Sequence, residues 1–194
     1  MTRLVKLGLL LAALAAVPMI DAAAQFRGVG AIGLAVPIGD FADEPDWDAQ
    51  DGGMTGLAGV EWVPTGSAFG LRLDGAYQKF CTSLCDQDAE NLDIGYRFLN
   101  ATLNGVLEFP LGADASVRPY FLGGIGIYNY ELVGDDVPEG LESVTDFGLN
   151  GGVGLTYQLK RVGIFGEARL HNVFGDQIDL QYIPIMLGAR IGFD

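Results

Sequence analysis

Positive charge is scarce in this 194-residue chain, which has 11 lysines and arginines against 25 aspartates and glutamates. Proteins that bind nucleic acid carry a basic stripe or patch, so a formal net charge of −14 excludes nucleic acid as a partner. The chain also has only two cysteines and one histidine. A structural zinc site takes four such ligands, so this inventory does not complete one.

Long uncharged runs are missing after the first 24 residues, where none reaches the roughly 18 residues that indicate a transmembrane helix. The N-terminal segment differs, because Arg3 and Lys6 precede an uncharged run from Leu7 to Ile20, and Ala22–Ala24 follow it. This order of basic, apolar and small residues is typical of a secretory signal peptide. A membrane-spanning helix is the alternative, but the run is shorter than the ~20 residues that cross a bilayer.

We therefore predict a signal peptide over residues 1–24 and one exported domain over residues 25–194, a length that suits a single domain. Export would place Cys81 and Cys85 in an oxidising compartment. We expect a disulfide between them, with a modest stabilising effect because the loop that it closes is short.

Eight stretches of the exported domain alternate in polarity with the two-residue period of β-strands. They cover Phe26–Val36, Met54–Val63, Phe69–Gln78, Ile94–Phe109, Val117–Tyr130, Phe147–Leu159, Val162–Phe174 and Tyr182–Phe193. The connections between them are alternately long and short. The long ones are Pro37–Gly53, Lys79–Asp93, Glu131–Asp146 and Gly175–Gln181. This order predicts an antiparallel up-and-down meander with short turns at one end and longer loops at the other.

Alternation alone does not show which face points inward, since a soluble lipocalin-like barrel has the same period with its apolar face inside. Here the polar faces are crowded with Gly, Ala, Asn and Thr, which fit a narrow interior. The apolar faces carry aromatic residues near the strand ends, as the girdles of a transmembrane barrel do: Phe69, Tyr77, Phe109, Phe147, Tyr157 and Phe193. We therefore predict an all-β, eight-stranded antiparallel transmembrane β-barrel, with the soluble barrel as the alternative.

The last predicted strand has an apolar residue at every second position and reaches an aromatic residue, Phe193, just before the final Asp194. Further patterns are Arg118–Gly126, Glu167-x-Arg169 and Gly188-x-Arg190-x-Gly192. With them the chain resembles the small eight-stranded outer-membrane β-barrel family of OmpA-like, OmpX-like and opacity-type surface proteins. The resemblance implies a place in the bacterial outer membrane, with short periplasmic turns and longer extracellular loops. It also implies contact with outer-membrane lipid and lipopolysaccharide, and recognition of the C-terminal strand by the barrel-assembly machinery.

Eight charged residues fall on the polar faces of the predicted strands: Glu61, Arg72, Asp74, Glu108, Arg118, Glu167, Arg169 and Arg190. An eight-stranded barrel is only wide enough for its side chains to fill it. Four acids and four arginines can neutralise one another there, and arginine forms bidentate bonds with carboxylates. We therefore predict a salt-bridged interior charge network. A polar path for a small solute or ions is the alternative.

His171, the single histidine, lies on the same face as Arg169, near one end of its strand. A lipid A deacylase of this family would show a serine two residues after such a histidine, where this chain has Val173. The serines of the exported domain lie in predicted turns or loops, with no paired base evident: Ser67, Ser83, Ser116 and Ser143. We expect no catalysis, a His171 without catalytic duty at the barrel rim, and no cofactor. A lipid- or peptide-modifying enzyme that uses His171 is the second alternative.

The long connections hold most of the acidic residues. Carboxylates are suitable ligands for Ca²⁺ or Mg²⁺. However, Asp46-x-Asp48 and Asp86-x-Asp88 do not extend to a complete calcium-binding loop. We predict no specific metal site and expect diffuse divalent-cation binding between the loops and lipopolysaccharide instead. The sequence thus favours a structural or surface-interaction role carried by acidic loops, with an external ligand that no motif identifies.

Overall fold

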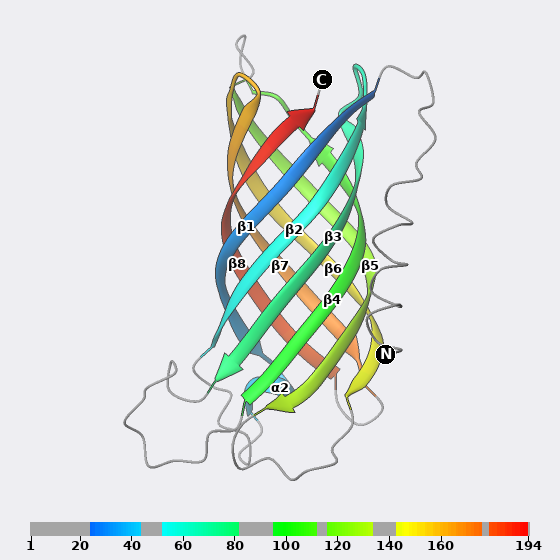
Figure 1. The fold of residues 1–194 in the computed structure, drawn as a ribbon, viewed down its shortest axis with the longest axis vertical. Helices are drawn as coiled ribbons and strands as arrows, with labels where there is room; N and C mark the ends of the chain where they lie inside the picture. Colours follow the sequence, from blue (N-terminus) through cyan, green and yellow to red (C-terminus); the bar gives the residue numbers. More distant parts are fainter. Residues whose placement is uncertain are drawn as a thin grey trace, which may run out of the picture.

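The computed structural model describes residues 24–43, 52–81, 95–111, 116–133, 143–175 and 179–193. Eight strands form one closed barrel, in which each strand pairs with its sequence neighbours and the last pairs with the first (Figure 1). All eight pairings are antiparallel. The predicted eight-stranded up-and-down barrel is therefore confirmed. Its strands are β1 (Ala24–Ile38), β2 (Gly53–Pro64), β3 (Phe69–Cys81), β4 (Gly95–Glu108), β5 (Val117–Val133), β6 (Val144–Leu159), β7 (Val162–Phe174) and β8 (Asp179–Phe193).

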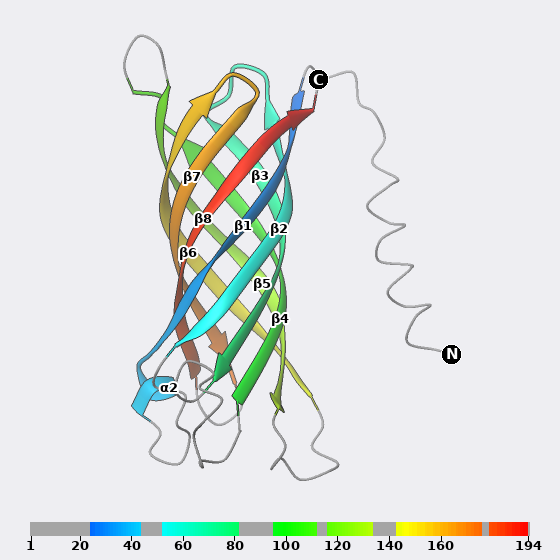
Figure 2. The ribbon, with the colours of Figure 1, turned by 60° about the vertical axis from the view of Figure 1, so that its left-hand side comes forward.

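The two ends of the barrel differ as the connection lengths predict (Figures 1 and 2). At one end, called here the turn end, Lys160 and Arg161 join β6 to β7. Lys160 has a φ of 52°, the left-handed conformation that so tight a turn requires. The opposite end is called the loop end. It carries α2 (Asp40–Asp43), a single helical turn at the end of β1.

Several strands run further at the loop end than the sequence pattern predicts. β5 continues to Val133, β6 begins at Val144, and β8 begins at Asp179. Polar and acidic residues interrupt the alternation of apolar and polar side chains in these stretches. The strands continue because backbone hydrogen bonding does not depend on side-chain polarity. The helical turn α2 was also not predicted, since four residues are too few to show a helical period.

Large apolar side chains lie on the outside of the barrel and charged ones on the inside. The six predicted girdle aromatics are all exposed, as are Ile32, Leu187 and many other aliphatic residues. Arg72, Glu61 and Arg169 are almost completely buried. This distribution is the reverse of that of a soluble barrel, so the lipocalin-like alternative is wrong. No helix within the described ranges is long and apolar enough to cross a membrane.

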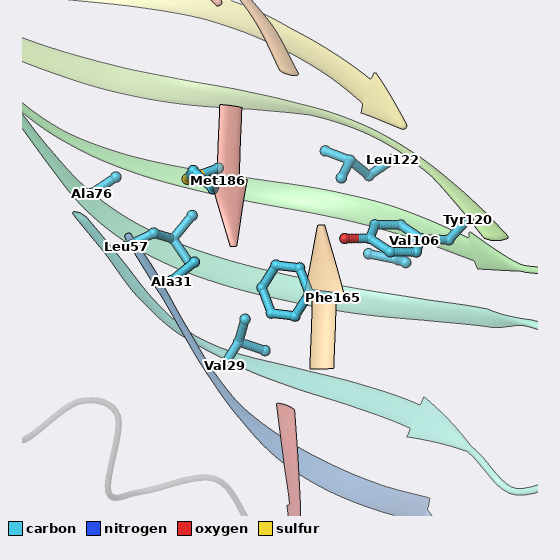
Figure 3. Packing of buried hydrophobic residues seen from close by; sticks show 9 residues of the cluster. All are labelled: Val29, Ala31, Leu57, Ala76, Val106, Tyr120, Leu122, Phe165 and Met186. Atoms are coloured by element: carbon cyan, nitrogen blue, oxygen red, sulfur yellow. The ribbon is translucent and has the colours of Figure 1, made fainter. Parts of the chain in front are cut away.

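Part of the barrel interior is filled by buried apolar side chains (Figure 3). Phe165 on β7 and Met186 on β8 belong to a cluster whose other members come from β1 to β5. The full cluster consists of Val29, Ala31, Leu57, Ala76, Val106, Tyr120, Leu122, Phe165 and Met186. It fills the space beside the charged residues, so that both together form the core of the barrel.

Candidate functional site: the barrel interior

The middle of the barrel is crossed by a closed ring of four charged side chains. Two come from β3 (Arg72 and Asp74) and two from β7 (Glu167 and Arg169), strands that lie on opposite walls of an eight-stranded barrel. Arg72 donates through Nε to Asp74 at 3.0 Å and through Nη2 to Glu167 at 2.8 Å. Arg169 donates through Nη2 to Asp74 at 2.8 Å and through Nε to Glu167 at 2.5 Å. Each arginine therefore contacts both acids, and the ring links the two walls.

Two neutral side chains extend this ring. The hydroxyl of Tyr120 donates to Glu167 at 2.7 Å, and the amide of Asn104 donates to Asp74 at 3.0 Å. All four charged members have side chains no more than 1 % exposed. Charges buried so deeply are stable only when they are paired, so each member depends on its partners.

A second charged cluster fills the turn end of the barrel. Glu108 accepts from Arg190 at 2.5 Å and lies 3.8 Å from Arg118. Glu61 lies 3.6 Å from Arg190 and 3.3 Å from Arg27. Arg27 also lies 3.3 Å from Glu108, so it joins both acids. Arg118 and Arg27 are partly exposed, with 28 % and 15 % of their side chains accessible, and Arg190 is buried.

Arg190 connects the two charged clusters through an aromatic contact. Its guanidinium lies 4.2 Å from the centre of the Tyr120 ring and 5.1 Å from that of Phe165, both within cation–π range. Among the described residues, its Nε and Nη2 have no hydrogen-bond partner. The ring faces thus take the place of hydrogen-bond acceptors for this part of the guanidinium.

The structure places all eight charged residues named from the sequence inside the barrel and adds Arg27, which the sequence interpretation missed. With Arg27 the two charged clusters hold five arginines and four acids, so together they carry a formal charge of +1 rather than zero. The sequence contained part of the signal, because the two-residue spacing between Arg27 and Val29 puts them on one face of a strand; the structure adds that Arg27 lies opposite Glu61. The inward side of β1 is otherwise small and apolar, so polarity alone did not reveal it.

The loop end of the interior is lined mainly by aromatic side chains. Phe41 of α2 packs edge-on against Phe80, Tyr96 and Phe98, with ring centres 5.4 to 6.0 Å apart. Phe80 and Phe98 in turn contact Tyr182 at 5.6 and 5.5 Å. These residues, Phe41, Phe80, Tyr96, Phe98 and Tyr182, form an aromatic cap at the loop end of the barrel interior.

His171 lies below this cap and not at the rim, where the sequence interpretation put it, and it is only 2 % exposed. Its Nδ1 forms a hydrogen bond with the Tyr128 hydroxyl at 2.9 Å, and its ring stacks on Tyr182 at 4.8 Å. Within the described residues, none of these contacts involves a serine or an acid, so no nucleophile is paired with the histidine. The arrangement is that of a packed core histidine.

Other predicted features fall outside the described ranges. Cys85 and most of the acidic residues of the long connections lie in segments 44–51, 82–94 and 134–142, so the predicted disulfide from Cys81 and the loop acids have no structural description. Among the described residues, no group of three or more His, Cys, Asp and Glu side chains is close enough to hold a metal ion.

Comparisons with known proteins agree with this architecture. Residues 7–193 match the family described as outer membrane protein beta-barrel domain. The structure is similar to neisserial surface protein A (TM-score 0.62, 14 % identity, 87 % of this chain and 97 % of that chain). It is also similar to Ail, the attachment invasion locus protein of Yersinia pestis (TM-score 0.53, 15 % identity, 88 % and 97 %), and to a major outer membrane protein of Thermus thermophilus (TM-score 0.52, 15 % identity, 88 % and 100 %).

Identities this low show a shared fold and not a shared activity. A search of curated proteins finds no match. The family match, by contrast, spans nearly the whole chain and agrees with the closed barrel and its apolar outer wall. The chain therefore belongs to the outer membrane protein β-barrel family and lies in the bacterial outer membrane.

Proposed function

We propose that this protein is a closed, non-conducting barrel that anchors an acidic surface outside the cell and engages cationic partners there. The observation that carries the first half of this proposal is the ring of Arg72, Asp74, Glu167 and Arg169, which joins opposite walls at mid-barrel. Its members are buried and directly paired, which supports a packed interior in place of an aqueous path. The aromatic cap supports the same conclusion at the loop end.

The charge of the long connections supports the second half. Segments 44–51, 82–94 and 134–142 contain aspartates and glutamates but no lysine or arginine. A surface of this sign attracts cations and basic polymers and repels polyanions. The structure of Ail in complex with the heparin analogue sucrose octasulfate illustrates the opposite preference on a related fold. We infer that a polysulfated ligand does not suit this chain.

The remaining partners follow from the location. The barrel is embedded in outer-membrane lipid, and its extracellular rim is surrounded by lipopolysaccharide. Divalent cations would bridge the anionic groups of lipopolysaccharide to the acidic connections. The barrel-assembly machinery would recognise β8, which ends on the exposed Phe193. Removal of residues 1–24 as a signal peptide would precede assembly. We assign no catalytic step to His171, because it is buried and packed between tyrosines.

Two measurements on the reconstituted protein test the proposal. In planar bilayers we expect no steady single-channel steps, and such steps would overturn the closed barrel. On vesicles we expect fluorescent polylysine to bind at low salt and to dissociate as ionic strength rises, while labelled heparin does not bind. Neutralising the four acids of segment 134–142 (Asp135, Asp136, Glu139 and Glu142) should weaken polylysine binding. Binding of heparin, or polylysine binding that is unaffected by this change, would contradict the acidic recognition surface.

A further inference from the structure

Nine basic residues follow residue 24, and all of them lie in the described ranges. They are distributed over three parts of the barrel. Five arginines lie in the interior, and Lys160 and Arg161 lie in the turn that joins β6 to β7. The remaining two, Lys79 on β3 and Arg97 on β4, are exposed on the outer wall at the loop end. They are direct neighbours in the strand register. Arg97 also pairs with Glu131 on β5.

An apolar groove of about 1050 Å³ runs obliquely round the outside of the barrel, over β6, β7, β8 and β1, and reaches the edge of β2. Its floor is low because β7 presents Gly166 and Ala168 outward, and it is flanked by larger residues of the neighbouring strands: Val153, Leu155, Ile185 and Leu187. It continues over β1 and ends at Val36 and Met54, near the loop end.

The groove leads to the basic pair. In the strand register, Ala168 lies beside Ile185, Ile185 beside Leu34, and Leu34 beside Met54. Met54 in turn lies beside Lys79, and Lys79 beside Arg97. Gly56, two residues after Met54, leaves this part of the wall open, since a Cβ there would meet no atom within 4 Å.

The dimensions of this path suit one leaflet of a membrane. Four strand spacings of ~4.8 Å separate Ala168 from Lys79, roughly 19 Å along a row that is tilted to the bilayer normal. The apolar half of a bilayer is ~15 Å thick. Because barrel strands are tilted by ~35–45°, this row rises about 11–14 Å along the bilayer normal, which is most of the apolar half. The long side chains of Lys79 and Arg97 extend over the remaining distance to the outer-leaflet headgroups.

We propose that this path is a specific site for the lipid A part of lipopolysaccharide, with an acyl chain in the groove and a phosphate on Lys79 and Arg97. Charge complementarity supports this occupant. Segments 44–51, 82–94 and 134–142 hold no lysine or arginine, whereas Lys79, Arg97 and the Glu131 that pairs with Arg97 together carry a net charge of +1. The exposed basic pair therefore attracts an anionic headgroup at the loop end. The proposal concerns the outer wall and is independent of the closed interior and of the cationic partners proposed above.

Native mass spectrometry of the refolded protein, released from detergent with added lipid, tests the site. The buffer contains EDTA, which removes divalent-cation bridges between lipid and acidic residues. We expect the parent to retain one diphosphoryl lipid A per chain, in preference to phosphatidylethanolamine and phosphatidylglycerol. Lys79→Gln with Arg97→Gln should lower lipid A retention about tenfold, through loss of two charge-assisted contacts. The matched control, Lys160→Gln with Arg161→Gln, removes the same charge at the periplasmic turn and should retain lipid A like the parent.

Substitutions that place a larger side chain in the groove test its role in lipid A binding separately. Ala168→Phe fills its floor and should lower lipid A retention, whereas Gly75→Phe adds a ring elsewhere on the outer wall and should not, since a Cβ there meets only backbone oxygens near 4 Å. Both changes face lipid, and the gel shift between heated and unheated samples verifies folding. Should Ala168→Phe alone not fold, Ala168→Leu takes its place. Equal retention by the double charge variant and the parent, or equal retention of lipid A and either phospholipid, would overturn the site. So would an equal loss in the control variants.

Discussion

Single residues on β3 and β7 build the mid-barrel ring because each strand places an arginine and an acid two positions apart, on the same inward face. Alternation predicts that these side chains are inside. It does not predict which arginine meets which acid, since pairing across the lumen depends on strand tilt and barrel closure. For the same reason, the contact of Arg190 with the Tyr120 ring was not foreseeable from the sequence.

Arg169→Ala tests the ring directly. The change leaves Asp74 and Glu167 to share Arg72 in a buried site, and breaking such a pair costs about 3–5 kcal/mol. We expect the urea midpoint of the protein in vesicles to fall accordingly, without any conductance. Arg161→Ala, in the exposed turn between β6 and β7, is the control and should lower the midpoint far less. Unchanged stability of Arg169→Ala together with new single-channel steps would argue for a water-filled pore.

Gly154→Ala tests the packing around the ring. A Cβ at Gly154 would lie 2.2 Å from Cζ of Tyr120, the residue that donates to Glu167. Overpacking of a filled core costs about 1–3 kcal/mol, so we expect a lower unfolding free energy in urea. Gly151→Ala on the outward face of the same strand is the control, because its Cβ meets only the Leu122 carbonyl oxygen at 3.8 Å. Equal stability of the two variants would contradict the close contact with Tyr120.

At the scale of the element, the pattern predicted the central parts of the strands better than their ends. In β6 the outward positions are apolar and the inward ones small or polar throughout its middle, so its faces were readable. The short α2 gave no periodic signal, although Phe41 anchors it to the aromatic cap. A contact of this kind becomes visible only when β1, β3 and β4 are brought together at one end.

Val153→Arg tests the outward face of β6. Val153 is 51 % exposed on the apolar wall near the middle of the strand, which lies near the bilayer centre. An arginine at that depth costs about 2–4 kcal/mol. We expect a lower yield of folded protein in vesicles and a lower unfolding free energy, measured by the heat-dependent gel shift and by urea titration. Val153→Leu should behave like the parent, and normal insertion of the arginine variant would mean that the face assignment is wrong.

Phe41→Ala tests the attachment of α2. Phe41 is 3 % exposed and loses its contacts with Phe80, Tyr96 and Phe98 in this variant. Since α2 is one turn at the end of a strand, we expect its loss to loosen the loop end and to leave the ring at mid-barrel intact. Hydrogen exchange should rise in residues 39–43 and 96–98 and stay unchanged in residues 70–75. Faster exchange throughout β3 would show that the cap stabilises the whole barrel.

For the molecule as a whole, the sequence predicted the number of strands, their order and the difference between the two ends. These features depend on periodicity and on connection lengths, which a single sequence contains. The groove on the outer wall was not predictable in this way, because it arises where Gly166 and Ala168 meet taller residues of β6 and β8 through the register. No motif in the sequence identifies the external partner either. The sequence characterises the proposed recognition surface only by its negative charge.

The orientation in the membrane can be tested with the two lysines of the exported domain, because one lies at each end of the barrel. Lys79 is exposed at the loop end of β3, and Lys160 is exposed in the turn between β6 and β7. A membrane-impermeant amine reagent added to intact cells should modify the peptide that contains Lys79 and leave the Lys160 peptide unmodified, as peptide mass spectrometry would show. Permeabilising the outer membrane should then allow modification of both. Lys79→Gln is the control, in which intact cells should give no modified lysine. Modification of Lys160 in sealed cells would place the short turns outside the cell and reverse the topology.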